Sequence, residues 1–161
     1  MRASLIAGVL LLAAVALPAS GQQTPAGDKD MIKVRQDLAD KFAAAIANKK
    51  NVTEAVAENY TADAVLQSLC PETPLAFGPD VYAKRVEGAL RTSGFRDYSA
   101  KVKEAHLLRD DVAWSAQSYT FTTTNKEGKP EQFHGNSIEM LRREGDKWKI
   151  SFQAYARTPC S

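Results

Sequence analysis

Residues 140–150 read Met-Leu-Arg-Arg-Glu-Gly-Asp-Lys-Trp-Lys-Ile. The Glu144-Gly145-Asp146 segment at their centre has the composition of a tight turn, and it separates two stretches rich in β-forming residues. The pattern predicts an antiparallel hairpin, with one strand over about 131–143 and the next over about 147–157. This hairpin ends a series of similar units, so it decides how the second half of the chain folds.

Two more turn segments lie upstream of this hairpin. Arg109-Asp110-Asp111 and Asn125-Lys126-Glu127-Gly128 predict further strands over about 96–108 and 111–124. Everything after Gly94 is therefore interpreted as four antiparallel strands in series. Apolar residues occur on both parities of these strands, so we expect helices on one face of the sheet and a second subunit on the other.

The first half of the chain has helical periodicity, interrupted once. A long amphipathic helix is expected from Asp28 or Asp30 to the break at 48–51, and a shorter one follows with Asn51 or Thr53 as its cap. The short apolar run 64–69 favours a buried strand. A third helix is expected from 78–80, with proline at its first position, to a stop at Gly94.

The N-terminal segment has the order of a secretory signal. Arg2 is followed by an apolar stretch over 5–17 and then by Pro-Ala-Ser-Gly at 18–21, and the stretch is shorter than the ~20 residues that span a bilayer. We expect residues 1–21 to be a signal peptide, cleaved after Gly21 or after Ala19, and the protein to be secreted or periplasmic without a membrane anchor. Residues 22–29 are expected to be a flexible tether, and 30–161 one domain.

Charge and composition exclude some partners. The chain has 21 Lys and Arg against 19 Asp and Glu, a balance that does not favour nucleic acid or an acidic membrane surface as a partner. Gly-rich phosphate loops, HExxH and Ser-His-Asp constellations are all missing from the sequence. We therefore expect no cofactor and no metal.

The order of helix, helix, short strand, helix and four long strands resembles that of the cone-shaped NTF2-like superfamily. Residues 59–65, Asn-Tyr-Thr-Ala-Asp-Ala-Val, resemble the family's Tyr-x-x-Asp-Ala entry into its first strand. Residues 140–150 are similar to the final hairpin of its SnoaL-like and DUF4440-type branches. The resemblance covers the chain from about residue 30 and implies an α+β fold, with three N-terminal helices packed on a curved, mostly antiparallel sheet around a pocket.

In the ketosteroid-isomerase branch of this family, a carboxylate just after the Asp-Ala entry removes a proton alpha to a carbonyl. Here Ser68, or Gln67 one register away, occupies the matching position, and neither serves as a base near neutral pH without a partner. The resemblance therefore does not carry the isomerase chemistry over, and we lean away from an enzyme.

Two other residues are candidate catalytic groups. His134 on a late strand could act as a general base, or it could lie exposed near a strand end. Glu139 is either on the solvated face of a sheet or a pocket acid with a raised pKa. Amide and tyrosine side chains form a further set that suits a pocket holding a ligand without reacting with it, although ordinary strand surface also predicts them: Gln67, Tyr82, Tyr119, Gln153 and Tyr155.

The two cysteines, Cys70 and Cys160, can pair in an oxidising compartment, the alternative being two free buried thiols. In NTF2-like folds the segments that carry them can lie side by side, and we therefore expect a Cys70–Cys160 disulfide. Such a bond requires the two Cα atoms to lie within ~7 Å.

The leading interpretation is an exported protein that binds a small apolar molecule in its cone and forms a homodimer through the sheet face. One alternative is an isomerase, cyclase or dehydratase that uses His134 or Glu139 in place of the usual acid. The other is a structural dimerisation module.

Overall fold

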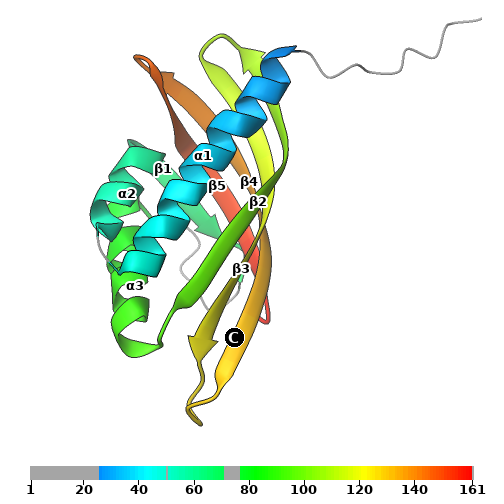
Figure 1. Cartoon of the computed structure of the whole chain (residues 1–161). Helices are drawn as coiled ribbons and strands as arrows, with labels where there is room; N and C mark the ends of the chain where they lie inside the picture. The colour runs from blue at the N-terminus through cyan, green and yellow to red at the C-terminus, as the bar shows by residue number, and fades with distance from the viewer. Residues whose placement is uncertain (1–25, 50, 71–76, 161) are drawn as a thin grey trace, which may run out of the picture.

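A computed structural model describes residues 26–49, 51–70 and 77–160. Three helices precede or interrupt a single five-stranded sheet (Figure 1). The helices are α1 (Ala26–Asn48), α2 (Val52–Asn59) and α3 (Pro79–Thr92). The strands are β1 (Tyr60–Ser68), β2 (Arg96–Arg109), β3 (Val112–Thr124), β4 (Pro130–Glu144) and β5 (Lys147–Thr158).

The sheet has the order β1-β5-β4-β3-β2. Consecutive strands from β2 to β5 pair antiparallel, as the three turn segments predict, whereas β1 pairs parallel with β5 at the edge. Gly145 lies in the last turn with a φ of +65°, a conformation that favours glycine because it has no Cβ. The expected α+β fold, with three helices on a curved and mostly antiparallel sheet, is confirmed.

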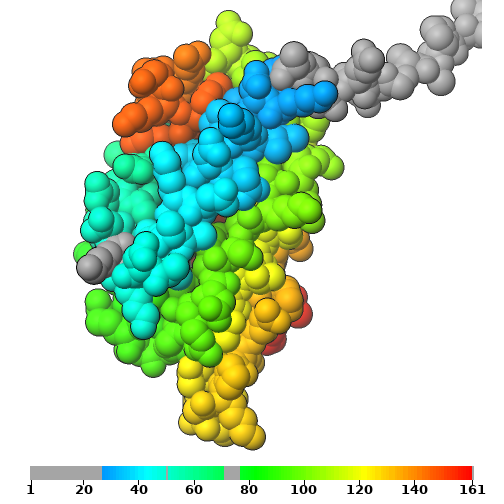
Figure 2. Space-filling model, viewed as in Figure 1, coloured from blue at the N-terminus to red at the C-terminus, as the bar shows by residue number. Residues whose placement is uncertain are grey.

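The helices cover one face of this sheet, and we call that face the inner face. In Figure 1, α1 runs alongside β2, while α2 and α3 lie together at one end. The hairpin end of β3 and β4 projects beyond the helices, as Figure 2 also shows. The inner face is therefore covered by α1 over β2 and by α3 beside β1.

Side chains of α1 that meet the sheet recur every three or four residues, as a helix packed on one face requires. They include Met31, Arg35, Phe42 and Ile46, all under 6% exposed. Met31, Phe42 and Ile46 are apolar residues at helical spacing in the sequence, and Arg35 lies on the same side of the helix as they do. This charged residue in the apolar stripe is central to the site described below.

Two predicted boundaries are corrected. Helix α1 begins at Ala26, so residues 26–29, which were expected to be tether, form its first turn. Asp28 is buried there and its Oδ1 accepts a hydrogen bond of 2.9 Å from the Leu107 amide, which ties that turn to β2. Strand β1 begins at Tyr60 instead of 64. The expected signal peptide, residues 1–21, and the rest of the tether lie outside the described residues.

Cys70 and Cys160 form the expected disulfide, with their Cα atoms 5.2 Å apart. The alternative of two free thiols is therefore wrong. The bond joins the end of β1 to the segment after β5, across a sequence separation of 90 residues. In the chain-entropy description, closing a loop of this length stabilises the folded state by about 4 kcal/mol.

The outer face of the sheet carries a row of apolar side chains. Trp114, Met140, Phe152 and Val65 are consecutive cross-strand neighbours on β3, β4, β5 and β1. Val65 in this row is 43% exposed, and Ile138 in the next row is 60% exposed. No described helix covers this face. None of the helices in the described part of the chain is both long and apolar enough to cross a membrane.

Candidate functional site

A cavity of about 260 Å³ lies between α3 and the inner face of the sheet. Its walls come from α3, the ends of β1 and β5, and the facing parts of β2 and β3. Six aromatic side chains line it: Tyr82, Phe95, Tyr98, Tyr119, Phe121 and Tyr155. The cavity is near the lower end of the usual size range for ligand pockets, about 300–1,000 Å³, and it has their mainly apolar lining.

Four of the five residues expected in the pocket line this cavity, namely Tyr82, Tyr119, Gln153 and Tyr155. Tyr119 reaches across the sheet, and its hydroxyl donates a 2.9 Å hydrogen bond to the carbonyl of Ala156. Gly135 lies opposite Tyr119 on β4, where a Cβ would collide with the tyrosine ring. Glycine at this position therefore lets the ring lie against the cavity wall.

The fifth expected residue, Gln67, does not line the cavity. Its neighbours Leu66 and Ser68 are buried on the inner face, so alternation along β1 turns Gln67 to the outer face. His134 is excluded from the cavity for the same reason, because it is exposed between the buried residues Phe133 and Gly135. The sequence alone did not show which face of the sheet each residue of these strands occupies.

Ser68 is therefore the inward-facing residue at the position where a family carboxylate was considered. It is 1% exposed and lines the cavity. Its Oγ accepts a hydrogen bond of 3.2 Å from the Cys70 amide, and its side chain is hydrogen-bonded to Tyr155. Burial raises the pKa of Tyr155, so its phenol stays protonated near neutral pH. This position holds two neutral hydroxyls and no base.

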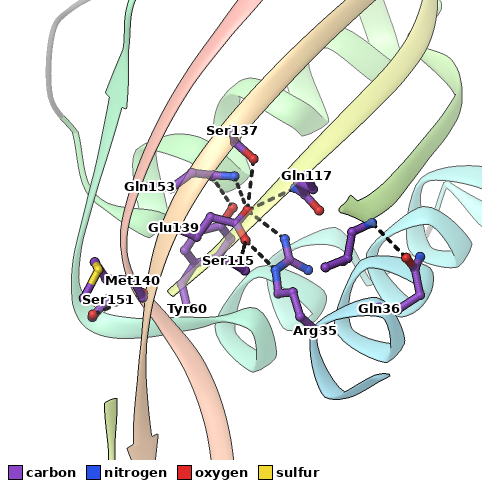
Figure 3. A network of polar contacts seen from close by, with 11 residues as sticks. Arg35, Gln36, Tyr60, Ser115, Gln117, Ser137, Glu139, Met140, Ser151 and Gln153 are labelled. Atoms are coloured by element: carbon purple, nitrogen blue, oxygen red, sulfur yellow. Dashed lines mark hydrogen bonds and ion pairs between the residues drawn. The ribbon is translucent and has the colours of Figure 1, made fainter. Parts of the chain in front are cut away.

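Glu139 lies beneath the cavity in a buried polar network (Figure 3). Arg35 forms two hydrogen bonds with it, Nε to Oε2 at 2.5 Å and Nη2 to Oε1 at 2.8 Å. Four neutral side chains from β3, β4 and β5 also donate to the carboxylate, over 2.8–3.2 Å: Ser115, Gln117, Ser137 and Gln153. All six donors point at one carboxylate, which makes this the most densely bonded group among the described residues.

Neither sequence interpretation of Glu139 is correct, because the residue is neither solvated nor a raised-pKa acid. Burial acts to raise its pKa, but the charge of Arg35 and the hydrogen bonds from Arg35, Ser115 and Ser137 outweigh it and hold the pKa below the ordinary value. Both oxygens are already engaged as acceptors. Glu139 is therefore a structural anion without room to take a proton from a substrate.

The network reaches the cavity through Gln153. Its Nε2 donates to Glu139 at 2.8 Å, while its Oε1 accepts a 2.6 Å hydrogen bond from the Tyr60 hydroxyl. Burial is the main cause that raises the pKa of Tyr60, so this donor keeps its proton. The amide of Gln153 is thus held from both sides, and it gives the cavity a fixed polar floor.

Sequence reasoning missed Arg35, Tyr60, Tyr98 and the cavity arginines Arg85 and Arg157. The sequence did contain one indication of Arg35, because this residue comes four positions after Met31 and so lies on the apolar side of the helix. A cation at such a position requires a buried anion as its partner. The sequence carried no comparable signal for Tyr98, because its inward direction depends on the register of β2.

A second hollow, of about 510 Å³, lies on the surface between α1 and α2. Although its volume is larger, it is lined largely by exposed polar and charged side chains, among them Lys41, Asn48 and Glu54. We therefore regard the aromatic cavity as the candidate site. Among the described residues, no group of three or more His, Cys, Asp or Glu is placed to hold a metal ion.

The buried ion pair predicts an asymmetric response to mutation. Replacing Arg35 alone with Met leaves Glu139 buried without its counter-charge, and we expect a loss of about 3–5 kcal/mol in the free energy of unfolding. The double variant Arg35→Met, Glu139→Gln removes the uncompensated charge and should be more stable than Arg35→Met alone. Urea denaturation at pH 7 measures both, and a double variant less stable than the single one would contradict the prediction.

The same pair makes stability depend on pH in one direction. Because the folded-state pKa of Glu139 is lowered, its contribution is complete above the unfolded-state value of about 4.3 and is lost as the pH falls further. Wild-type protein should therefore lose more stability between about pH 5 and pH 3 than Glu139→Gln. Glu131→Gln, at a solvent-accessible position on the same strand, is the matched control and should follow wild type.

Solved structures of other proteins share the fold of this chain, although no sequence comparison finds a relative. No family model and no curated protein sequence matches the chain. A solved ketosteroid isomerase-like protein from Erwinia carotovora atroseptica has a TM-score of 0.63 and 23% identity, over 80% of this chain and 97% of that one. An NTF2-like protein of unknown function from Silicibacter pomeroyi has a TM-score of 0.59 and 12% identity, over 79% and 95%.

A type 2 hexachlorocyclohexane dehydrochlorinase is also similar, with a TM-score of 0.61 and 12% identity over 78% of this chain and 84% of that one. At these identities the likeness establishes the architecture and leaves activity to be argued from the site. The helices, the strand order and these likenesses agree, and the chain has the fold of the NTF2-like superfamily.

Proposed function

We propose that this protein is an exported binding protein that holds a small, mainly apolar molecule in the cavity between α3 and the sheet. The observation that carries the proposal is the cavity itself, with six aromatic side chains around a space of about 260 Å³. Burying a ring against such walls removes apolar surface from water, at roughly 25 cal/mol per Å². The fixed amide of Gln153 gives a bound molecule one polar reference point.

The composition of the cavity supports binding over catalysis. General base catalysis needs an acceptor that is both near the substrate and free to take a proton. The described lining residues include no Asp, Glu, His or Lys, and Ser68 stands at the considered family position. His134 is on the outer face, and Glu139 is saturated with donors. An enzyme built on those two candidates has no support from this geometry.

Filling the cavity should abolish binding. Ala89 on α3 lines the cavity, and Ala89→Trp would place an indole in the space that a ligand needs. The neutral fluorescent probe N-phenyl-1-naphthylamine should bind the wild-type protein with increased emission, and Ala89→Trp should weaken its affinity by at least about tenfold, the loss expected for one buried ring.

Lys84→Trp is the matched control, because Lys84 is exposed on the same helix and does not line the cavity. It should bind the probe like wild type, and circular dichroism should show both variants folded. Equal probe affinity in wild type and Ala89→Trp would mean that the probe binds elsewhere. No binding to wild type by this or similar one- to three-ring compounds would refute the proposed function.

We further propose export, on the signal-like order of residues 1–21 and on the disulfide, which persists in oxidising compartments. Expressed with its own leader in a bacterial host, the protein should be recovered from the periplasm or medium with Gln22 at its N-terminus. Cleavage after Ala19 is the alternative. Intact-mass spectrometry without reductant should show the mature mass less two hydrogen atoms, whereas an intact leader or two free thiols would contradict the proposal.

We also propose that the outer face of the sheet joins two copies of the chain. Contiguous exposed apolar surface on a sheet marks an interaction site, and Ile138 lies in its middle between Ala116 and Ala154. Ile138→Lys should shift the protein toward monomer in sedimentation velocity. Val81→Lys, at an exposed apolar residue on α3, makes the same chemical change away from the sheet and should leave the dimer intact. A monomeric wild-type protein would refute this proposal.

A further inference from the structure

Two arginines occur in the wall of the aromatic cavity. Arg85 comes from α3 and Arg157 from the end of β5, and both line the cavity with Tyr155. None of the described lining residues is Asp or Glu. A cavity whose charged wall groups all have one sign has a positive potential inside it, which favours an anion over a neutral or cationic molecule.

Arg85 is held in place without using its hydrogen-bond donors. Its guanidinium carbon lies over the Phe77 ring, 4.1 Å from the ring centre, in a cation–π contact. Phe77 in turn packs against the rings of Tyr82 and Tyr155, with centroids 6.5 and 6.4 Å away. Among the described residues Arg85 makes no hydrogen bond or ion pair. The contact with Phe77 positions the guanidinium and leaves its N–H donors for a ligand.

Arg157 adds to the same field. Its guanidinium carbon lies 5.3 Å from the centre of the Phe133 ring, on the inner face near the cavity. Burial raises the pKa of Tyr155, but Arg85 and Arg157 both act against that rise. Two cationic groups on different elements therefore act on one hydroxyl in the cavity wall, which locates the positive potential beside Tyr155.

The floor of the cavity offers a ligand much less. The amide of Gln153 is already bonded to Glu139 and Tyr60, and the Tyr119 hydroxyl is bonded to Ala156. A ligand's strongest polar contact is thus at the arginine side, with its apolar body against the rings of Tyr82, Tyr98 and Phe121. The cavity volume of about 260 Å³ limits that body to one to three rings.

We propose that the ligand of this cavity is an aromatic carboxylate of one to three rings, whose carboxylate is bound by Arg85 in the positive field that Arg157 reinforces. The inference rests on the proposed function, which requires only that the cavity bind an apolar molecule. It adds the chemical class of the ligand and names Arg85 as the residue that selects it. A guanidinium fork matches a carboxylate in two parallel hydrogen bonds.

The test compares two competitors that differ only in charge. Mature protein, residues 22–161, is loaded with N-phenyl-1-naphthylamine at pH 7, and the probe is displaced by 2-naphthoate or by 2-naphthamide. We expect the carboxylate to displace the probe at a concentration at least about tenfold lower, as a charge-assisted contact predicts. Arg85→Gln should reduce this preference to less than about threefold, and Arg85→Lys should retain an intermediate preference.

Lys84→Gln is the matched control, since it removes one exposed positive charge from the adjacent position on α3. It should keep the full preference, which separates a contact at Arg85 from a change in net charge. If Arg85→Gln fails to fold, wild-type protein still tests the inference. Raising NaCl from about 0.05 to about 0.5 M should weaken naphthoate much more than naphthamide, because salt screens a partly exposed charge.

The outcomes separate the two proposals. Equal displacement by both competitors, with probe binding that Ala89→Trp abolishes, would overturn the carboxylate inference and leave the proposed function standing. A preference that survives in Arg85→Gln, or that Lys84→Gln removes equally, would overturn the role of Arg85. A wild-type protein that binds neither the probe nor either competitor would overturn both proposals.

Discussion

The buried ion pair between Arg35 and Glu139 is the constraint on which the rest of the structure depends. Two charges taken out of water destabilise a fold unless each is bonded by the other and by further polar groups. Glu139 meets this requirement with donors from α1, β3, β4 and β5 (Figure 3). The network therefore favours one rotation of α1 on the sheet and one register of β3, β4 and β5, because a slip of one residue would remove a donor from the carboxylate.

The cavity walls follow from that same register. Tyr119 comes two residues after Gln117 on β3, and Tyr155 comes two residues after Gln153 on β5, so both point to the inner face with the network. At the far end the disulfide joins the end of β1 to the segment after β5, where the Cys160 sulfur lies 3.1 Å from the backbone carbonyl oxygen of Arg157. The aromatic cavity is thus held between a polar network and a covalent bond.

Much of the architecture could be predicted, because local chemistry determines it. Turn segments such as 144–146 and 125–128 predicted the ends of strands β2 to β5 to within a residue or two, and the two cysteines paired as expected. The direction of each side chain could not be predicted, since it depends on a parity that bulges reset. Gln67 and Ser68 were left as alternatives for that reason, and the bulge between Tyr60 and Val65 lies just before them. For the same reason His134 had two interpretations, a general base or an exposed strand residue, and the exposed one agrees with the structure. Arg35 was overlooked because helical periodicity was counted from apolar residues alone.

The chemistry of the cavity follows from which of its groups can gain or lose a proton. Burial, as the leading cause, raises the pKa of the phenols of Tyr82, Tyr98, Tyr119 and Tyr155, so all four remain protonated and act as neutral hydrogen-bonding groups. The buried carboxylate of Glu139 is neutralised by Arg35, and the inward position on β1 holds Ser68. A reaction that moves a proton needs a group whose protonation state can change within the cycle. The described cavity walls hold protonated phenols, the fixed amide of Gln153 and permanent cations, and the proposed binding role rests on this set.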